Sequence, residues 1–145
     1  MLLKIKDIMT DNVATVSPET TVVEAARLMQ QHDIGSLPVC EGPELVGIVT
    51  DRDIVVRSVA HGKDLATTPI REVMTQRVAT ASPETDVHQV ATLMSNQQIR
   101  RLPVVENNRL VGMVSLGDLA TQAKTEVELA KTLGEISQPA APKRM

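Results

Sequence analysis

Hydrophobic positions recur with a helical period at two places in the chain. Each run spaces four apolar residues as i, i+3, i+4 and i+7, which is one face of a helix. The two runs are Val22, Ala25, Ala26 and Met29, and Val87, Val90, Ala91 and Met94. A Thr or Asp followed three residues later by Glu or Gln stands before each run, as in a capping box. The pattern predicts helices over Val22–His32 and Val87–Gln97.

Short apolar and β-branched runs on either side of these helices predict strands. A β segment closed by a Ser-Pro turn precedes each helix, and two strands joined by a four-residue turn follow it. The predicted strands are Val13–Val16, Leu37–Cys40 and Leu45–Val49, and then Val78–Ala81, Leu102–Val105 and Leu110–Val114. A second helix begins at Thr50 and at Ser115. The predicted fold class is therefore α/β (α+β), with two β-α-β-β-α units.

These two units are copies of one sequence. Residues 6–57 align with residues 71–122 at a constant offset of 65, and 23 of the 52 pairs are identical. Such self-similarity is the signature of a repeat, and we expect two repeats packed with pseudo-two-fold symmetry. The predicted domains are residues 6–64 and 65–123. Residues 124–145 are predicted to form a helical extension over 126–136 and a frayed tail from 138 onward.

Composition narrows the class of protein. An apolar fraction of 42% and a charged fraction of 23% are ordinary for a soluble globular domain. No run approaches the ~18 apolar residues of a membrane span, and the charged start does not fit a secretory signal, so we predict a cytoplasmic protein. The net charge of −3 and the absence of Phe, Tyr and Trp disfavour nucleic-acid binding, because phosphates need clustered cations and bases stack on aromatic rings.

Catalytic and metal chemistry find little support in the sequence. No phosphate-binding loop, dinucleotide fingerprint or nucleophile with a motif-placed base is present. The three histidines and the single cysteine, Cys40, do not have the spacing of zinc ligands. We therefore predict a protein that is not an enzyme and binds no metal.

One polar motif recurs in both repeats: a Gly within a strand, a Ser or Thr at the strand end, and an Asp three residues later. The motifs are Gly47, Thr50 and Asp53, and Gly112, Ser115 and Asp118. A capping box and a close packing contact would explain them in purely structural terms. Alternatively, the Gly admits a flat ring, the hydroxyl meets a phosphate or sugar oxygen, and the carboxylate accepts two hydrogen bonds from a vicinal diol such as that of ribose. The motif alone leaves both interpretations open.

The whole set of motifs resembles a tandem pair of CBS domains, which is called a Bateman module. Met-Thr, Ser-Pro, Leu-Pro-Val, Leu-Val-Gly and Gly-x-x-Thr/Ser-x-x-Asp occur twice, in order, over about residues 6–123. The runs at 32–40 and 50–55 also resemble stand-alone CBS-pair proteins of the hypoxic-response type. The resemblance implies a regulatory module that binds AMP, ADP, ATP, S-adenosylmethionine or NAD(H), forms a homodimer through the helices Val22–His32 and Val87–Gln97, and signals to an effector protein.

The same resemblance implies two sites, each joining the motif of one repeat to the first strand and the Leu-Pro segment of the other. One would combine Gly47, Thr50 and Asp53 with Val78, Ala79, Ile99, Arg100, Arg101 and Pro103. The other would combine Gly112, Ser115 and Asp118 with Val13, Ala14, Ile34, Ser36 and Pro38. The two aspartates would hold ribose diols. Arg100 and Arg101 would favour a more phosphorylated ligand at the Asp53 site, unless they are solvated surface charges, and Arg52 would supply charge at the other.

A second class of function stays open at this point. The same fold and dimer could serve as an interaction scaffold whose clefts hold no regulatory ligand. Because a bound ligand raises the stability of a folded protein, its effect on the melting temperature separates the two classes.

Overall fold

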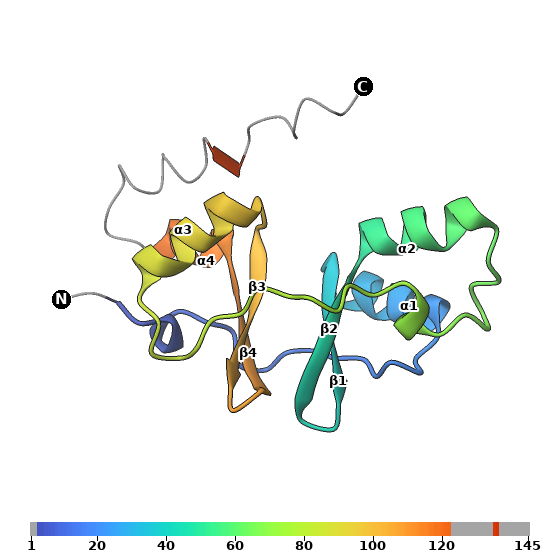
Figure 1. Ribbon diagram of the computed structural model, residues 1–145, viewed down its shortest axis with the longest axis horizontal. Coiled ribbons are helices and arrows are strands. Elements are labelled where there is room, and N and C mark those ends of the chain that lie inside the picture. The colour runs from blue at the N-terminus through green and yellow to red at the C-terminus, as the bar shows by residue number, and fades with distance from the viewer. Residues whose placement is uncertain (1–2, 123–134, 137–145) are drawn as a thin grey trace. The chain divides into compact units, whose positions relative to one another are not determined.

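The computed structural model describes residues 3–122 and 135–136 and divides into two compact units (Figure 1). The first-repeat unit contains residues 12–78 and 107–110. The second-repeat unit contains residues 3–11, 79–106 and 111–122. Each unit packs its helices beside its own hairpin (Figure 1).

The long helix of each unit has the bounds that the hydrophobic spacing predicts. Helix α1 spans Val22–His32 and helix α3 spans Val87–Gln97. The side chains of Thr21 and Asp86 cap them by accepting hydrogen bonds from the amide N–H three residues on, at 3.3 Å and 3.0 Å. Both helices end at a residue in the left-handed conformation, Asp33 or Gln98. The caps at the two ends explain why the pattern located the helices so closely.

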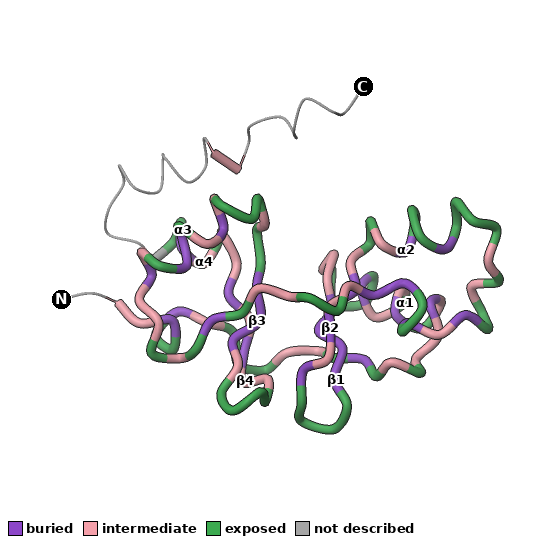
Figure 2. Tube along the Cα trace, viewed as in Figure 1, coloured by how far each residue is buried: buried purple, intermediate pink, exposed green. Residues whose placement is uncertain are grey.

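A β-hairpin follows each long helix. Strands β1 (Ser36–Glu41) and β2 (Glu44–Thr50) pair antiparallel, with a bulge at Val39 and Cys40. Strands β3 (Arg101–Glu106) and β4 (Arg109–Ser115) form the second hairpin, whose turn holds Asn107 and Asn108 at positive φ. Glu44 of β2 also pairs antiparallel with Arg109, the first residue of β4, which belongs to the same compact unit as β2. Figure 2 shows buried positions along the strands and exposed positions at the hairpin tips.

The first β segment of each repeat is shorter than the sequence predicts. Over 13–16 and 78–81 the backbone forms a single parallel bridge each, Val16 with Val39 and Ala81 with Val104. The Val16 N–H donates to the Pro38 carbonyl at 3.1 Å, and the Cys40 N–H donates to the Val16 carbonyl at 2.8 Å. Ser-Pro follows at once and turns the chain, so the segment ends before a strand can extend.

Short helices complete the units. Helix α2 spans Asp51–Arg57 and helix α4 spans Leu116–Gln122. Three single 3-10 turns, η1 (Ile5–Asp7), η2 (Val59–His61) and η3 (Ile70–Glu72), lie in the connecting segments. The helical extension and tail predicted over 124–145 lie outside the described residues, apart from 135–136. None of the described helices is long and apolar enough to cross a membrane.

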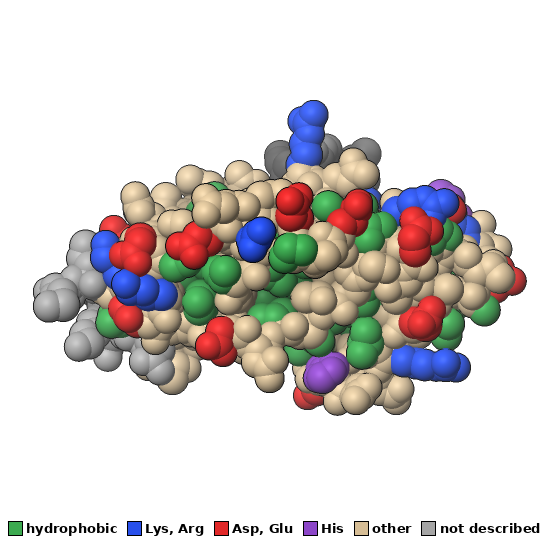
Figure 3. All heavy atoms as spheres, turned by 90° about the horizontal axis from the view of Figure 1, so that it is seen from below, with side chains coloured by type: hydrophobic (Ala, Val, Ile, Leu, Met, Phe, Trp, Pro, Cys, Tyr) green, Lys and Arg blue, Asp and Glu red, His purple; other side chains and the backbone are tan. Residues whose placement is uncertain are grey.

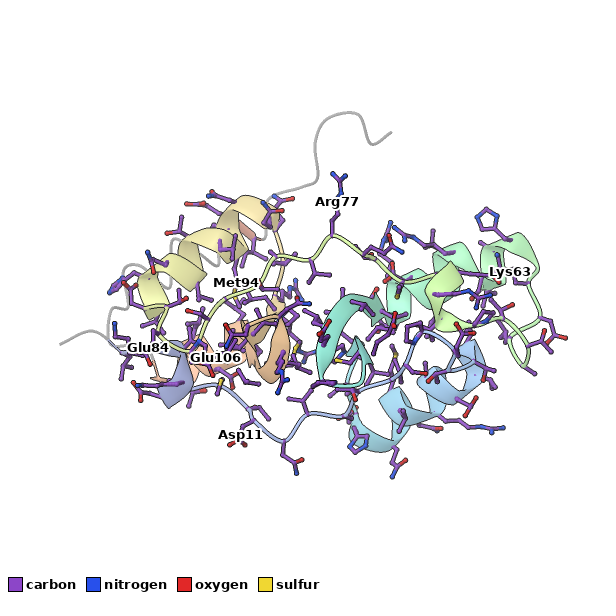
Figure 4. All side chains as sticks on the ribbon, turned by 60° about the horizontal axis from the view of Figure 1, so that its bottom comes forward. Asp11, Lys63, Arg77, Glu84, Met94 and Glu106 are labelled. Atoms are coloured by element: carbon purple, nitrogen blue, oxygen red, sulfur yellow. The ribbon has the colours of Figure 1, made fainter. Side chains whose placement is uncertain are left out.

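Each unit has its own hydrophobic core. Both cores are aliphatic, because the chain contains no aromatic side chain. In the first-repeat unit the buried face of α1 packs with Leu37, Val39 and Val49 of the hairpin. In the second-repeat unit the corresponding centre includes Met94, which is labelled in Figure 4 and is fully buried.

The leading segment of each repeat completes the core of the other repeat. Ile70 and Val73, at the start of the second repeat, are fully buried in the first-repeat core. Ile5 and Ile8 occupy the same place in the second-repeat core. Backbone hydrogen bonds join the same segments, since the Ile70 N–H donates to the Thr20 carbonyl at 2.7 Å and the Ile5 N–H to the Thr85 carbonyl at 2.8 Å. The compact units therefore exchange their leading segments relative to the sequence repeats.

Candidate functional site

The two Ser/Thr-x-x-Asp motifs begin α2 and α4, and both form a capping box. The Thr50 hydroxyl accepts from the Asp53 N–H at 3.0 Å, and Oδ2 of Asp53 accepts from the Thr50 N–H at 2.9 Å. In the second repeat the same two bonds, between Ser115 and Asp118, measure 3.0 Å and 2.8 Å. The structural interpretation of the motif is thus present in both repeats. It uses one oxygen of each carboxylate and leaves Oδ1 for another partner.

The remaining oxygen has different surroundings in the two repeats. Oδ1 of Asp53 lies 3.7 Å from Nε of Arg57, one turn along α2, and the Asp53 side chain is only 12% exposed. Arg57 also donates from Nη1 to the carbonyl of Met74 at 3.2 Å. Within the described part of the chain, Oδ1 of Asp118 has no hydrogen-bond or ion-pair partner. Arg57 was not among the residues predicted from the sequence, although its i+4 spacing from an acidic residue on one helix was a usable signal.

The strand glycines are explained by a packing contact. A Cβ at residue 47 would lie 2.7 Å from the Thr75 carbonyl oxygen, and one at residue 112 would lie 2.8 Å from the Thr10 carbonyl oxygen. Both distances are shorter than real Cβ contacts. Each carbonyl belongs to a leading segment that bridges the strand, as in the paired bonds of Ile48 with Thr75 at 2.8 Å and 2.9 Å. This packing contact is sufficient to require glycine at both positions, and the further role of admitting a flat ring stays a prediction.

The residues that precede β1 and β3, Gly35 and Arg100, lie against the starts of helices α2 and α4. The Asp51 N–H donates to the Gly35 carbonyl at 2.9 Å, and the Leu116 N–H donates to the Arg100 carbonyl at 2.7 Å. Ser36 pairs with Thr50 across the β1–β2 ladder, and its enclosed hydroxyl has no hydrogen-bond partner among the residues that the structure describes. Ser36 thus neighbours the Thr50–Asp53 motif within its own unit, while its predicted part in the Asp118 site stays a prediction.

The predicted site residues divide between the units. The first-repeat unit holds Val13, Ala14, Ile34, Ser36, Pro38, Gly47, Thr50, Arg52, Asp53 and Val78. The second-repeat unit holds Ala79, Ile99, Arg100, Arg101, Pro103, Gly112, Ser115 and Asp118. Pro38 and Pro103 are buried in their strands, whereas Arg52, Arg100 and Arg101 are exposed. The grouping of residues across the two repeats stays a prediction.

Charge and metal-ligating groups are dispersed over the described residues. On the face shown in Figure 3, acidic and basic side chains are interspersed. Among residues 3–122 and 135–136, no three His, Cys, Asp or Glu side chains come together as a metal site. Burial raises the pKa of the Cys40 thiol. Together with Glu24 and Arg27, Cys40 lines an open depression of about 600 Å³ on the first-repeat unit. No sequence pattern had indicated this depression.

Comparison with known families identifies the chain. The CBS domain model matches residues 5–59 and 70–124. The chain belongs to the CBS domain family. Its two repeats are therefore two CBS domains, and their mixed α/β organisation with antiparallel hairpins agrees with the α/β fold class and the resemblance inferred from the motifs.

Individual relatives match over most of their own length. The chain is 46% identical over 133 residues to the CBS domain-containing protein YhcV of Bacillus subtilis, covering 92% of this chain and 94% of the relative. It is 36% identical over 116 residues to Hypoxic response protein 1 of Mycobacterium tuberculosis, covering 79% and 81%. A crystal structure of Hypoxic Response Protein I, with two coordinated zinc ions, superposes with a TM-score of 0.76 at 35% identity, covering 83% and 98%.

A further solved structure carries nucleoside ligands. The CBS domain pair of protein MJ0100, crystallised with 5′-methylthioadenosine and S-adenosyl-L-methionine, superposes with a TM-score of 0.75. Its sequence identity to this chain is 34%, with 83% of this chain and 95% of that chain covered. CBS pairs of this fold thus include one that binds adenosyl compounds.

Proposed function

We propose that this CBS pair is a non-catalytic regulatory module that binds an adenosine-bearing ligand and signals to a partner protein. AMP, ADP, ATP and NAD are the ligands that we propose to test first. The adenosyl ligands of the MJ0100 pair support this class of ligand. Binding changes the output only if the ligand has different affinities for two states of the module, such as two arrangements of a homodimer.

The observation that carries the proposal is the second oxygen of each motif carboxylate. Oδ2 of Asp53 and of Asp118 holds the helix start, at 2.9 Å and 2.8 Å from the strand-end amide nitrogen. Oδ1 is thereby left to a partner other than the start of the helix. A carboxylate oxygen of this kind accepts hydrogen bonds from a vicinal diol, which ribose presents, and such charge-assisted bonds contribute about 1.5–3 kcal/mol.

The residues proposed for each site are the two sets that the resemblance implies, and they include Arg100 and Arg101 on the Asp53 side. These two arginines are exposed and form no ion pair among the described residues. Two uncompensated guanidinium groups would favour a ligand with more phosphate groups at the Asp53 site. The Asp118 site would take a less phosphorylated one.

Calorimetry with AMP and ATP on Asp53→Ala and Asp118→Ala tests the proposal. Each substitution should weaken binding at its own site by about 10–100-fold, since it removes one or two charge-assisted bonds. Asp86→Ala is the matched control, because Asp86 caps α3 through a 3.0 Å bond from the Gln89 N–H and belongs to neither predicted site. Unchanged affinity in both motif variants would refute the assignment of the two carboxylates.

An interaction scaffold is the second candidate, and one observation favours it. Val55, Val56 and Val59 are 56%, 43% and 52% exposed along α2 and the following turn, which is a suitable surface for another protein. Since the chain lacks Trp and Tyr, a copurifying purine would give a clear absorbance band near 260 nm. A preparation without that band, whose melting temperature does not respond to millimolar AMP, ATP or NAD, would favour the scaffold.

A further inference from the structure

Arg57 joins the motif carboxylate of the first repeat to the segment that covers Gly47. Its Nε lies 3.7 Å from Oδ1 of Asp53, which is a charge contact and too long for a hydrogen bond. Its Nη1 donates to the carbonyls of Val73 and Met74 at 3.4 Å and 3.2 Å. The planar guanidinium is therefore anchored by two backbone groups while its other edge faces the carboxylate.

This anchoring distinguishes Arg57 from an ordinary surface partner of an acidic residue. An exposed i, i+4 ion pair is weak because both long side chains lose entropy when they meet. Here the entropy of the arginine is already reduced by its bonds to the backbone, and the Asp53 side chain is only 12% exposed. The contact between the two charges is consequently available to orient the carboxylate.

The second repeat has no arginine at the position that corresponds to Arg57. Position 122, which the offset of 65 makes the counterpart of position 57, is Gln, although the Ser115–Asp118 motif is otherwise preserved. Rotation of an aspartate about its last torsion is soft. A bond from the strand-end amide holds one oxygen of each carboxylate, and among the described residues an arginine lies against the other oxygen in the first repeat alone.

We propose that Arg57 is a positioning residue for Asp53, and that it sets the selectivity of the first-repeat site for a ribose diol over a deoxyribose. The proposal rests on the proposed function, in which Oδ1 of Asp53 accepts from the ribose hydroxyls. With the carboxylate plane fixed, both hydroxyl bonds can form at good geometry. Without Arg57 the carboxylate rotates, and the contribution of the 2′-hydroxyl falls most.

The test compares ATP with 2′-deoxy-ATP by calorimetry, in an Asp118→Ala background that leaves only the first-repeat site, for which a more phosphorylated ligand is proposed. Arg57→Gln introduces the residue of the second repeat. It should weaken ATP binding about three- to fivefold, the range for loss of one half-exposed charge contact, and change 2′-deoxy-ATP binding little. The preference for ATP therefore shrinks by the same factor. A general loosening of the fold would weaken both ligands alike and leave the preference unchanged.

Arg71→Gln is the matched control. Arg71 is an arginine of the same unit, its side chain is 50% exposed like that of Arg57, and it also pairs with a carboxylate, that of Glu19 at 2.9 Å. This variant should keep the wild-type preference. If Arg57→Gln is too unstable to titrate, Arg57→Lys replaces it and should lose a smaller part of the preference, because the charge stays and the anchored fork is lost.

The outcomes separate this proposal from the proposed function. If the Asp118→Ala protein binds no ATP, or binds ATP and 2′-deoxy-ATP equally, the diol role of Asp53 fails. If it prefers ATP and the Arg57 variants keep the same preference, the diol role stands and the positioning role of Arg57 is overturned.

Discussion

Replacing Gly47 by Ala separates the two explanations of the strand glycine. In the packing explanation, the added methyl group would lie 2.7 Å from the Thr75 carbonyl oxygen and 3.1 Å from Sδ of Met74. The sulfur is part of a flexible side chain and can move. The carbonyl oxygen is held, because it accepts from the Ile48 N–H at 2.9 Å, so the methyl group must displace a bridged backbone segment.

The expected size of the effect follows from two opposing contributions. Forcing one extra carbon into a packed site costs about 1–3 kcal/mol. Replacing glycine by alanine within a strand returns about 0.5–1 kcal/mol of backbone entropy. Gly47→Ala should therefore destabilise the protein by about 1–2 kcal/mol without any ligand present. Gly112→Ala should behave alike, since its Cβ would lie 2.8 Å from the Thr10 carbonyl oxygen.

Urea unfolding followed by circular dichroism at 222 nm measures this effect, since the chain has no Trp or Tyr for fluorescence. Gly117→Ala is the control, because the nearest atom to its Cβ is Oγ of Ser115 at an ordinary 3.5 Å and the residue lies within α4. It should stabilise the protein by up to about 1 kcal/mol, as expected for glycine to alanine in a helix. A Gly47→Ala protein as stable as the wild type would refute the packing explanation.

Three further predictions concern the core, a helix cap and the cysteine. Ile70→Ala should lower the free energy of unfolding by about 2–5 kcal/mol, as truncation of a buried Ile does. Amide hydrogen exchange should then accelerate in α1, β1 and β2 of the first-repeat unit. Acceleration confined to the second-repeat unit would contradict the swapped placement of the leading segments. The hydrogen bonds from Thr21 lower the pKa of Glu24 below its ordinary 4.5, so the stability they provide is complete above pH 4.5 and is lost as the pH falls through the lower folded value; Glu24→Gln should remove this acid dependence from a pH series of urea midpoints. Burial and a raised pKa should make Cys40 alkylate slowly in the native protein and quickly in urea; equal rates would contradict its burial.

Local sequence signals were sufficient for the elements. The bounds of α1 and α3 agree with the prediction, because apolar spacing and capping residues act within one helix. The hairpin strands extend only about one residue beyond the predicted ends, as at Ser36–Glu41, since turn residues mark them. The first β segments were predicted too long, because their extent depends on a parallel bridge to a strand more than twenty residues away in the sequence.

Non-local packing was not predictable from the motifs. Ile5 and Ile70 read as the beginnings of their own repeats, yet each is buried in the core of the other. The same exchange explains Gly47 and Gly112, whose partners, Thr75 and Thr10, come from these segments. The role of Arg57 was not predicted for a related reason. Two of its three contacts are the carbonyls of residues 73 and 74, which belong to the leading segment of the second repeat. Repeat alignment cannot reveal which copy of a segment fills which core.

The reciprocal placement of Ile5 and Ile70 has a consequence for breaking the chain. A cut between residues 64 and 65 would leave one piece without Ile70 and Val73 and the other without Ile5 and Ile8, so each would have a hollow centre and an uncovered strand edge. Each piece would also carry the very stretch that its counterpart lacks. Mixed together, the pieces should reassemble by fragment complementation, whereas either one alone should remain largely unfolded.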